Sequence, residues 1–504
     1  MGKNKTLIAI TFLLLVLFVS AGIWFKYGRM DNGNDSTSSF QGDPLQPYKL
    51  VVVYPSTPQK DEAAIERELN SYLTKTINAT IDLRPIDWGP WDDQRNLMIG
   101  SEEAVDIYFT AQWTNFAVHV AQGAFLPLDE LLISHGQGIL AYQNPIYLEG
   151  TKINGKNYGI STTKELASQG GILYRKDIAE ELGLDMSTVK SVADLLPVLE
   201  KVRAAKPEMT PLFLNKDENF AIHYFSNLDS LGNIELDGVV DKEGTDTTVH
   251  SKLENPRYIS ILKATRELFI RSLINSDAAT TQASVDDALR SGKVFATTRP
   301  LKPGKAEEIA ITTNLVGKLG QVEMNARTVS SSETAGAMLA ISAASADPER
   351  AMMFINLLHT DKTLLNMLNF GIEGIHYTRS GEIISPTDRT PDYSPNISWE
   401  FGNQFLNYLW TTENPDKWNQ FKMFSIGAKQ SPAFGFTFDA EPVKTYAASM
   451  INVRRQYDAA LETGSVDVDN VLPEYLSRME AAGLDKVIRA KQEQLNAYLA
   501  SKNN

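Results

Sequence analysis

The chain contains no cysteine among its 504 residues. Disulfide bonds, thiolate metal sites and cysteine nucleophiles are therefore excluded, and so is a lipid anchor attached to a cysteine. Basic residues are outnumbered as well: 48 lysines and arginines stand against 62 acidic residues, which gives a net charge of −14. Because nucleic-acid binding requires a basic surface that neutralises phosphates, this balance argues against a nucleic-acid partner.

Motifs of catalysis are equally scarce. The chain has no G-x-x-x-x-G-K-[ST] phosphate loop and no H-x-x-x-H pair among its six histidines, so neither ATP hydrolysis nor a zinc site is expected. Two S-x-x-K patterns start at Ser161 and Ser187 but lack the partner motifs of acyl enzymes. The acidic segment 467–470 lacks the glycine and distal glutamate of a calcium loop, so helix capping explains it better. We therefore expect no cofactor, no metal and no enzymatic activity.

One long apolar run is present near the start of the chain, from Leu7 to Phe25. At about 1.5 Å per residue it spans roughly 28 Å as a helix, close to the thickness of a bilayer. The lysines before it are typical of an export signal. We expect residues 1–30 to form a signal or signal-anchor segment and the polar residues 31–47 to form a disordered spacer. Cleavage after Ala21, which would release the protein, is the alternative.

From residue 49 onward the hydrophobic pattern alternates between strands and helices. Strands are predicted at 49–54, 79–83 and 105–109, with helices at 92–99 and 113–122 and a further helix that Thr57 and Pro58 open. This order predicts an α/β fold with a parallel sheet covered on both faces. A second α/β unit follows, Asp347 is predicted to cap a helix through residue 358, and the chain is mainly helical from about 399.

Aromatic and polar side chains gather where the first strands end. Ligands of parallel α/β sheets bind outside the carboxyl ends of the strands, and aromatic faces beside short polar groups suit a sugar. Core packing is the alternative for each tryptophan. The candidate ligand-binding residues in this region are Tyr54, Trp88, Trp91, Gln112, Trp113 and Asn115.

Several segments resemble one family of proteins. GKNYGI at 155–160, LYRKD at 173–177 with ELGL at 181–184, and the passage from Ile341 to Ala351 resemble motifs of extracellular solute-binding proteins of bacterial ABC importers, in the maltose-binding-protein-like class. The segments GIEGIHY at 371–377 and FGFTFD at 434–439 resemble the LipO-like branch of Gram-positive bacteria. The resemblance extends over about residues 48–500, and the order and spacing of the motifs make it specific.

The resemblance implies a periplasmic-binding-protein-like fold of two discontinuous lobes. We expect lobe one at 48–160 plus 343–385 and lobe two at 161–342 plus 386–504, with a carbohydrate, especially an oligosaccharide, in the cleft between them. It also implies ABC permease subunits as partners. Members of the family usually carry a lipidated cysteine, which is missing here. The segment 7–25 is therefore expected to hold the protein at the outer face of the membrane, unless cleavage makes it secreted.

Further candidates come from the remainder of the chain. Tyr174 lies in the LYRKD motif, and Arg299 follows a strand end, where a surface salt bridge is the alternative. Glu373, His376 and Tyr377 could bind sugar hydroxyls or stabilise the passage between lobes. Two other functions stay open. One is a glycosidase, for which Asp129 and Glu373 are candidates only by location, and the other is a sensory or scaffold protein of the same fold.

Overall fold

The computed structural model describes residues 45–502. Residues 47–504 form one compact unit. The apolar helix predicted at 7–25 and nearly all of the predicted spacer lie outside the described residues. Within residues 45–502, no helix is both long and apolar enough to cross a membrane.

The first sheet has five strands in the order β2-β1-β3-β14-β6. β1 is parallel to β2 and β3, whereas β14 is antiparallel to both β3 and β6. The predicted parallel arrangement is thus confirmed for the first three strands, and β14, which runs against its neighbours, makes the sheet mixed. Its strands and the helices that follow β1, β2, β3 and β14 are β1 (Tyr48–Pro55), α2 (Glu62–Ile77), β2 (Ala79–Ile86), α3 (Trp91–Gly100), β3 (Ile107–Thr110), α4 (Phe116–Ala121), β6 (Ile160–Ser161), β14 (Met338–Ile341), α15 (Pro348–Thr360) and α16 (Lys362–Phe370).

The helix predicted to open at Thr57 begins at Glu62 instead. The backbone N–H of Asp61 donates to the carbonyl of Asp392 (3.1 Å), and the side chain of Gln59 accepts from the backbone N–H of Ser394 (2.9 Å). These bonds hold the segment before α2 against a part of the chain that is far away in sequence. The predicted Asp347 cap is confirmed, because its carboxylate accepts from the N–H of Arg350 (2.9 Å).

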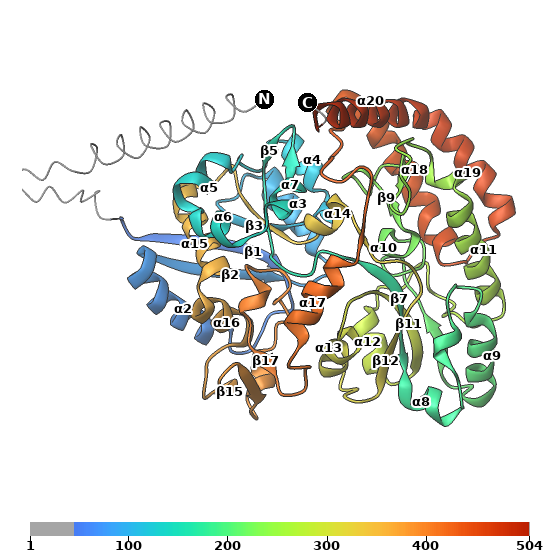
Figure 1. Cartoon of the computed structure of the whole chain (residues 1–504), viewed down its shortest axis with the longest axis horizontal. Coiled ribbons are helices and arrows are strands. Elements are labelled where there is room, and N and C mark those ends of the chain that lie inside the picture. The colour runs from blue at the N-terminus through green and yellow to red at the C-terminus, as the bar shows by residue number, and fades with distance from the viewer. Residues whose placement is uncertain (1–44, 503–504) are drawn as a thin grey trace, which may run out of the picture. The chain divides into compact units, whose positions relative to one another are not determined.

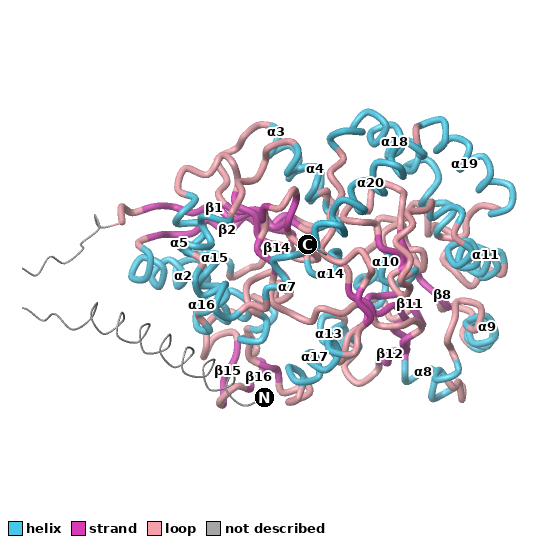
Figure 2. The backbone as a smooth tube through the Cα atoms, turned by 45° about the horizontal axis from the view of Figure 1, so that its top comes forward, coloured by secondary structure: helices cyan, strands magenta, loops and turns pink. Residues whose placement is uncertain are grey.

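The second sheet has four strands in the order β12-β7-β11-β8. β7 is antiparallel to both of its neighbours, and β11 is parallel to β8. Figure 2 shows the strands of the two main sheets as two separate groups. The strands and the helices around this sheet are β7 (Gln169–Arg175), α8 (Lys176–Glu181), α9 (Leu195–Ala205), β8 (Thr210–Phe213), α12 (Val285–Arg290), β11 (Val294–Leu301), α13 (Lys305–Thr312) and β12 (Leu319–Glu323).

The C-terminal helices pack beside α11. In Figure 1, α18, α19 and α20 lie together next to α11, and their apolar residues share one core. Buried Tyr258 from α11, Tyr475 from α19 and Leu495 from α20 belong to this core. The helices concerned are α11 (Pro256–Ile270), α18 (Lys444–Glu462), α19 (Val468–Ala482) and α20 (Leu484–Lys502); α17 (Lys417–Ile426) contributes Phe424 to another, smaller core.

Two segments that join the sheets run next to each other. Residues 162–168 lead from β6 to β7, and residues 324–337 lead from β12 back to β14. An antiparallel bridge pairs Ser168 with Thr328. The buried carboxylate of Glu333 accepts from the Ser168 hydroxyl (2.8 Å) and from the Lys242 ammonium (2.7 Å). The passage between the sheets is thus a paired element held by side chains from both segments.

Candidate functional site

Three tryptophans and a phenylalanine form an aromatic cluster at the carboxyl edge of the first sheet. Trp88, which follows β2, stacks on Trp113 (ring centroids 6.1 Å apart, planes at 25°) and on Trp399 (6.0 Å, 16°). Phe109 of β3 packs against Trp113 (6.2 Å) and presents its edge to Trp399 (5.6 Å, 79°). We call Trp88, Trp113 and Trp399 the tryptophan stack.

One member of the stack, Trp113, is fixed by a hydrogen bond, and another, Trp88, is exposed to solvent. Trp113 is fixed by its indole N–H, which donates to the carbonyl of Gly336 (2.8 Å) in the segment that returns from the second sheet. Trp88 is 48% exposed, whereas Phe109 is fully buried. A large apolar ring system is therefore available to solvent at the edge where the sequence predicts a ligand.

Trp399 is not among the residues that the sequence predicts for the site. It lies in the connection 393–403, which has no helix or strand apart from single bridges, and the helices that were predicted from about 399 start only at Lys417. No local pattern marks Trp399 as a partner of Trp88, because only the fold brings these distant segments together. The sequence also does not mark its neighbour Glu400. This acid is buried, and burial raises its pKa well above the usual range.

Trp91 does not join the stack. It opens α3 and is only 2% exposed, with Phe109 against its ring (6.2 Å) and the Arg95 guanidinium 5.2 Å from its centroid. The structure therefore places it in the core, which is the alternative that the sequence left open. The spacing explains the difference: Trp88 precedes the helix in a turn, whereas the first turn of α3 directs Trp91 inward.

The other three candidates of the first sheet differ in their access. Tyr54 is buried at the end of β1, with the edge of Phe401 5.2 Å away. Gln112 is 4% exposed, its backbone N–H donates to Ala335 (2.8 Å), and its side-chain NH₂ is buried without a hydrogen-bond partner among the described residues. Asn115 adopts the left-handed conformation (φ 63°) between the short helix 112–114 and α4. Of the three, Gln112 has an unused side-chain donor, one residue before Trp113 in the chain.

Tyr174 and Arg299 lie on the second sheet, Tyr174 near the far end of β7 and Arg299 on β11 opposite Gly171, near the start of β7. β7 leaves the joining segment at Gln169, so Tyr174 is about 16 Å further along the strand, at about 3.3 Å per residue. Arg299 forms ion pairs with Glu218 (2.8 Å) and Asp286. These bonds fit the salt-bridge alternative for Arg299.

Glu373, His376 and Tyr377 stabilise the turn that follows α16. His376 is fully buried, accepts from the N–H of Ile372 at Nδ1 (3.0 Å) and faces Asp61 with Nε2 (3.1 Å). Tyr377 is 4% exposed, and the exposed Glu373 pairs with Arg379 (2.9 Å). This arrangement matches the structural alternative, in which the segment fixes a connection of the chain.

The residues considered for catalysis or metal binding form hydrogen bonds or ion pairs with neighbouring parts of the chain. The Ser161 hydroxyl donates to the carbonyl of Thr334 (2.6 Å), and Lys164 lies beside Glu165 (3.4 Å). Asp129 accepts from the backbone and side chain of Asn157 (3.2 Å each), and Asp467 caps α19. Among residues 45–502, no three His, Cys, Asp or Glu side chains are grouped so that they could hold a metal ion.

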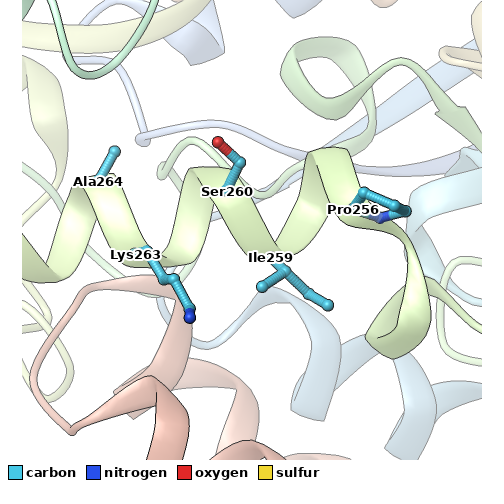
Figure 3. A pocket seen from close by; sticks show the side chains of 5 residues that line it. All are labelled: Pro256, Ile259, Ser260, Lys263 and Ala264. Atoms are coloured by element: carbon cyan, nitrogen blue, oxygen red, sulfur yellow. The ribbon is translucent and has the colours of Figure 1, made fainter.

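A shallow depression on the surface of α11 has few polar groups. It is lined by five residues of α11, which Figure 3 shows leaving the helix in different directions. Lys263, its one charged residue, pairs with Asp469 (2.6 Å). Because its polar side chains do not converge, this depression is a weaker candidate than the tryptophan stack.

Comparisons with known proteins agree with the fold and the motifs. Residues 432–500 match a family model described as a domain of unknown function, DUF3502. A "Carbohydrate ABC transporter substrate-binding protein" of Streptococcus pneumoniae serotype 4 is 26% identical over 442 residues, which are 86% of this chain and 87% of that protein.

Solved structures are similar over nearly the whole described chain. The N-glycan transport solute-binding protein NgtS of Streptococcus pneumoniae has a TM-score of 0.79 at 25% identity, over 90% of this chain and all of that one. The complex of NgtS with Man5GlcNAc has a TM-score of 0.80 at 26% identity, over 90% of this chain and 99% of that one. The alginate-binding protein AlgQ2 (0.62, 18%, over 92% and 100%) shows the same fold. The mixed α/β fold of solute-binding proteins and the resemblance to extracellular solute-binding proteins of carbohydrate ABC importers are therefore confirmed.

Proposed function

We propose that this protein captures an oligosaccharide outside the cell and delivers it to an ABC permease. The tryptophan stack carries the proposal. Sugar rings present C–H faces that pack on indole rings, while their hydroxyls need polar neighbours such as the unpartnered amide of Gln112. A half-exposed Trp88 with Trp113 and Trp399 against it supplies such a surface.

We place the bound sugar between two lobes built around the two sheets. The paired segments 162–168 and 324–337 are the proposed hinge, because both pass between the sheets and their residues bond to each other. Hinges of binding proteins are short segments that absorb a change in backbone angles while the lobes move as rigid bodies. The lobe boundaries proposed from the sequence, 48–160 plus 343–385 and 161–342 plus 386–504, stand as part of this proposal, with β14 assigned to lobe one because it pairs with β3 in the first sheet.

The relatives favour N-glycan fragments as the ligand class. The similar NgtS structures were solved with Man5GlcNAc and Man1GlcNAc. We infer that this chain binds a mannose-containing oligosaccharide with several rings, since three stacked indoles offer more surface than one monosaccharide ring covers.

Calorimetric titration tests the proposal directly. The probes are Man5GlcNAc, Man1GlcNAc and kestose, each against the unmodified protein, Trp88→Ala and Tyr142→Ala. Tyr142 is a matched control, because it is an exposed aromatic residue (74%) on the separate helix 137–142. We expect Man5GlcNAc to bind, Trp88→Ala to weaken binding about 10-fold or more, and Tyr142→Ala to leave it unchanged. Equal affinity in all three proteins would overturn the assignment of the stack.

The alternatives give different results in the same samples. A glycosidase would release shorter sugars from Man5GlcNAc, which chromatography of the titrated solution detects. A sensory or scaffold protein would bind the glycan, but cells that express it together with an ABC permease would not take the glycan up through it. Uptake that depends on this protein separates transport from sensing.

Membrane attachment through residues 7–25 belongs to the same proposal. The chain has no cysteine that could carry lipid, so the apolar run is the available anchor. Mass spectrometry of the protein isolated from cells tests this point. An intact N-terminal segment in the membrane fraction supports the anchor, and a chain that starts at Gly22 in the medium supports cleavage after Ala21.

A further inference from the structure

A second cavity lies beside the first sheet, on the side away from the tryptophan stack. Its volume is about 680 Å³, within the range of about 300–1,000 Å³ that ligand sites occupy. It is formed by the C-terminal half of α3, by α4 and the turn after it, and by residues 342–344 beyond β14. Side chains alternate between the faces of a strand. Tyr108 therefore faces this cavity, while the next residue, Phe109, faces the stack.

Two buried polar groups of the cavity lining have no hydrogen-bond partner. The hydroxyl of Tyr108, which is 1% exposed, and Nδ1 of His119, which is 4% exposed, are both unpaired among the described residues. Buried polar atoms are nearly always paired, with protein or with a bound molecule, because an unpaired one costs free energy. Both rings pack against Phe125, with ring centroids 6.2 Å and 5.8 Å away, so these two side chains of the cavity lining share one neighbour.

The hydrogen bonds that are present define what the two groups can bind. The Nε2 atom of His119 lies 3.0 Å from the side-chain oxygen of Asn96, so Nε2 carries the proton and Nδ1 is an acceptor. Burial, together with the charge of Arg95, lowers the pKa of His119 to about 3, and burial raises the pKa of Tyr108. The imidazole is therefore neutral and the phenol protonated at neutral pH, which leaves one free acceptor and one free donor.

The rim of the cavity excludes some ligand classes. Glu102, Glu103 and the exposed Gln122 all line the cavity, and Glu103 also pairs with Arg84 (2.8 Å). Two carboxylates disfavour an anion. Hydroxyl groups both donate and accept, so they can accept from the Tyr108 hydroxyl and donate to Nδ1 of His119. Met98, Ile99 and Val118 add apolar surface for the carbon skeleton of a small molecule.

We propose that this cavity is a second binding site, for one small uncharged polyhydroxy compound of monosaccharide or polyol size. The site holds its ligand through the Tyr108 hydroxyl and Nδ1 of His119. It is independent of the tryptophan stack, since Phe109 and Tyr108 direct the two sites to opposite faces of β3.

Tyr108→Phe is the sharpest variant for this site. It removes a hydroxyl that bonds to nothing in the described chain, so the melting temperature is expected to stay the same or to rise. Gln122→Trp is the second variant, because Gln122 is an exposed residue of the cavity lining and tolerates a large side chain that takes up cavity volume. Trp88→Ala serves as the control that weakens the other site.

The experiment measures binding of D-mannose, myo-inositol and glycerol by protein-detected NMR, together with crystals soaked in each compound. We expect at least one compound to bind with millimolar or tighter affinity. Tyr108→Phe and Gln122→Trp should each weaken that binding at least 10-fold, while Trp88→Ala leaves it unchanged. Binding that survives both cavity variants overturns the proposal, and so does a crystal structure in which only water contacts Tyr108 and His119. Failure of Man5GlcNAc to bind at the stack would not affect this result.

Discussion

Trp88 and Trp91 are separated by one turn of chain but differ in environment. Trp88 is 48% exposed above Trp113 and Trp399, whereas Trp91 is 2% exposed against Phe109. A half-exposed ring contributes little to the core, because much of its surface stays in contact with water in the folded state. A buried indole contributes by both area and packing.

Unfolding in urea distinguishes the two tryptophans. We expect Trp91→Ala to lower the free energy of unfolding by about 3–5 kcal/mol, as is usual when a large buried aromatic side chain is removed. Trp88→Ala is expected to change it by less than about 1 kcal/mol while weakening glycan binding. A loss of stability in Trp88→Ala as large as that in Trp91→Ala would show that the stack is a packing feature and not a binding surface.

Asp458 links stability to pH. Burial by itself raises the pKa of this carboxyl, but the charges of Arg454 and Lys252 and the hydroxyl of Tyr475 (2.5 Å) outweigh burial and lower the pKa. A carboxyl with a lowered folded-state pKa stabilises the protein above its unfolded pKa of about 3.9, and this contribution is lost as the pH falls below that value.

We therefore expect Asp458→Asn to weaken the pH dependence of stability on the acid side. The variant should be less stable than the unmodified protein at pH 7, by about 3–5 kcal/mol, because buried Arg454 loses its carboxylate and Lys252 keeps only Glu462 (3.0 Å). The difference should shrink as the pH is lowered toward 3. Urea unfolding at pH 7, 5 and 3 measures it, with Asp469→Asn at an exposed position (78%) as the control. A difference that does not change with pH would contradict the assignment.

At the scale of elements, the loop that carries Trp399 is fixed by one glycine. Gly402 has φ 60°, and a Cβ atom there would lie 2.1 Å from the carbonyl oxygen of Leu358 in α15. Its own carbonyl accepts from the N–H of Thr163 (2.8 Å) in the joining segment. The loop, α15 and the proposed hinge therefore meet at this position.

Gly402→Ala is expected to lower stability and glycan affinity together, because the loop must move and take Trp399 with it. Gly381→Ala is the matched control: it has φ 62°, but a Cβ atom added there would have no other atom within 4 Å. The control should cost only about 1 kcal/mol for the left-handed backbone, and it should leave binding unchanged. Thermal unfolding and calorimetric titration of both variants provide the comparison. Similar effects in both would mean that backbone conformation alone, not the contact with Leu358, constrains the loop.

At the scale of the whole molecule, the proposed function requires the two lobes to approach each other on binding. The absence of cysteine makes this measurable, since two introduced cysteines would be the only sites for fluorescent labels. Tyr142→Cys and Ile270→Cys place labels at exposed positions (74% and 56%) in the parts built around the first and second sheets.

We expect energy transfer between these labels to increase when Man5GlcNAc is added. Labels at Ile270 and Val316, which both belong to the part around the second sheet, should show no change. Single-molecule fluorescence of both labelled pairs, with and without sugar, gives the result. Binding without any change in the first pair would rule out lobe closure as the capture mechanism.

Much of this molecule follows from local sequence. The alternation of strands and helices predicted the parallel part of the first sheet, and Asp347 with Pro348 predicted the start of α15, because periodicity and capping depend on residues that are close in the chain. Two members of the tryptophan stack could also be proposed, since the carboxyl ends of parallel strands share one edge. The missing cysteine alone excluded disulfide bonds within these 504 residues.

The tertiary structure decided the remainder. It brought Trp399 to Trp88, buried Trp91, and paired Arg299 with Glu218 and Asp286. It also placed β14 between β3 and β6, antiparallel to both. Each of these outcomes depends on contacts between segments that are far apart in sequence, and the energy of such contacts comes from burial and pairing that exist only once the chain has folded.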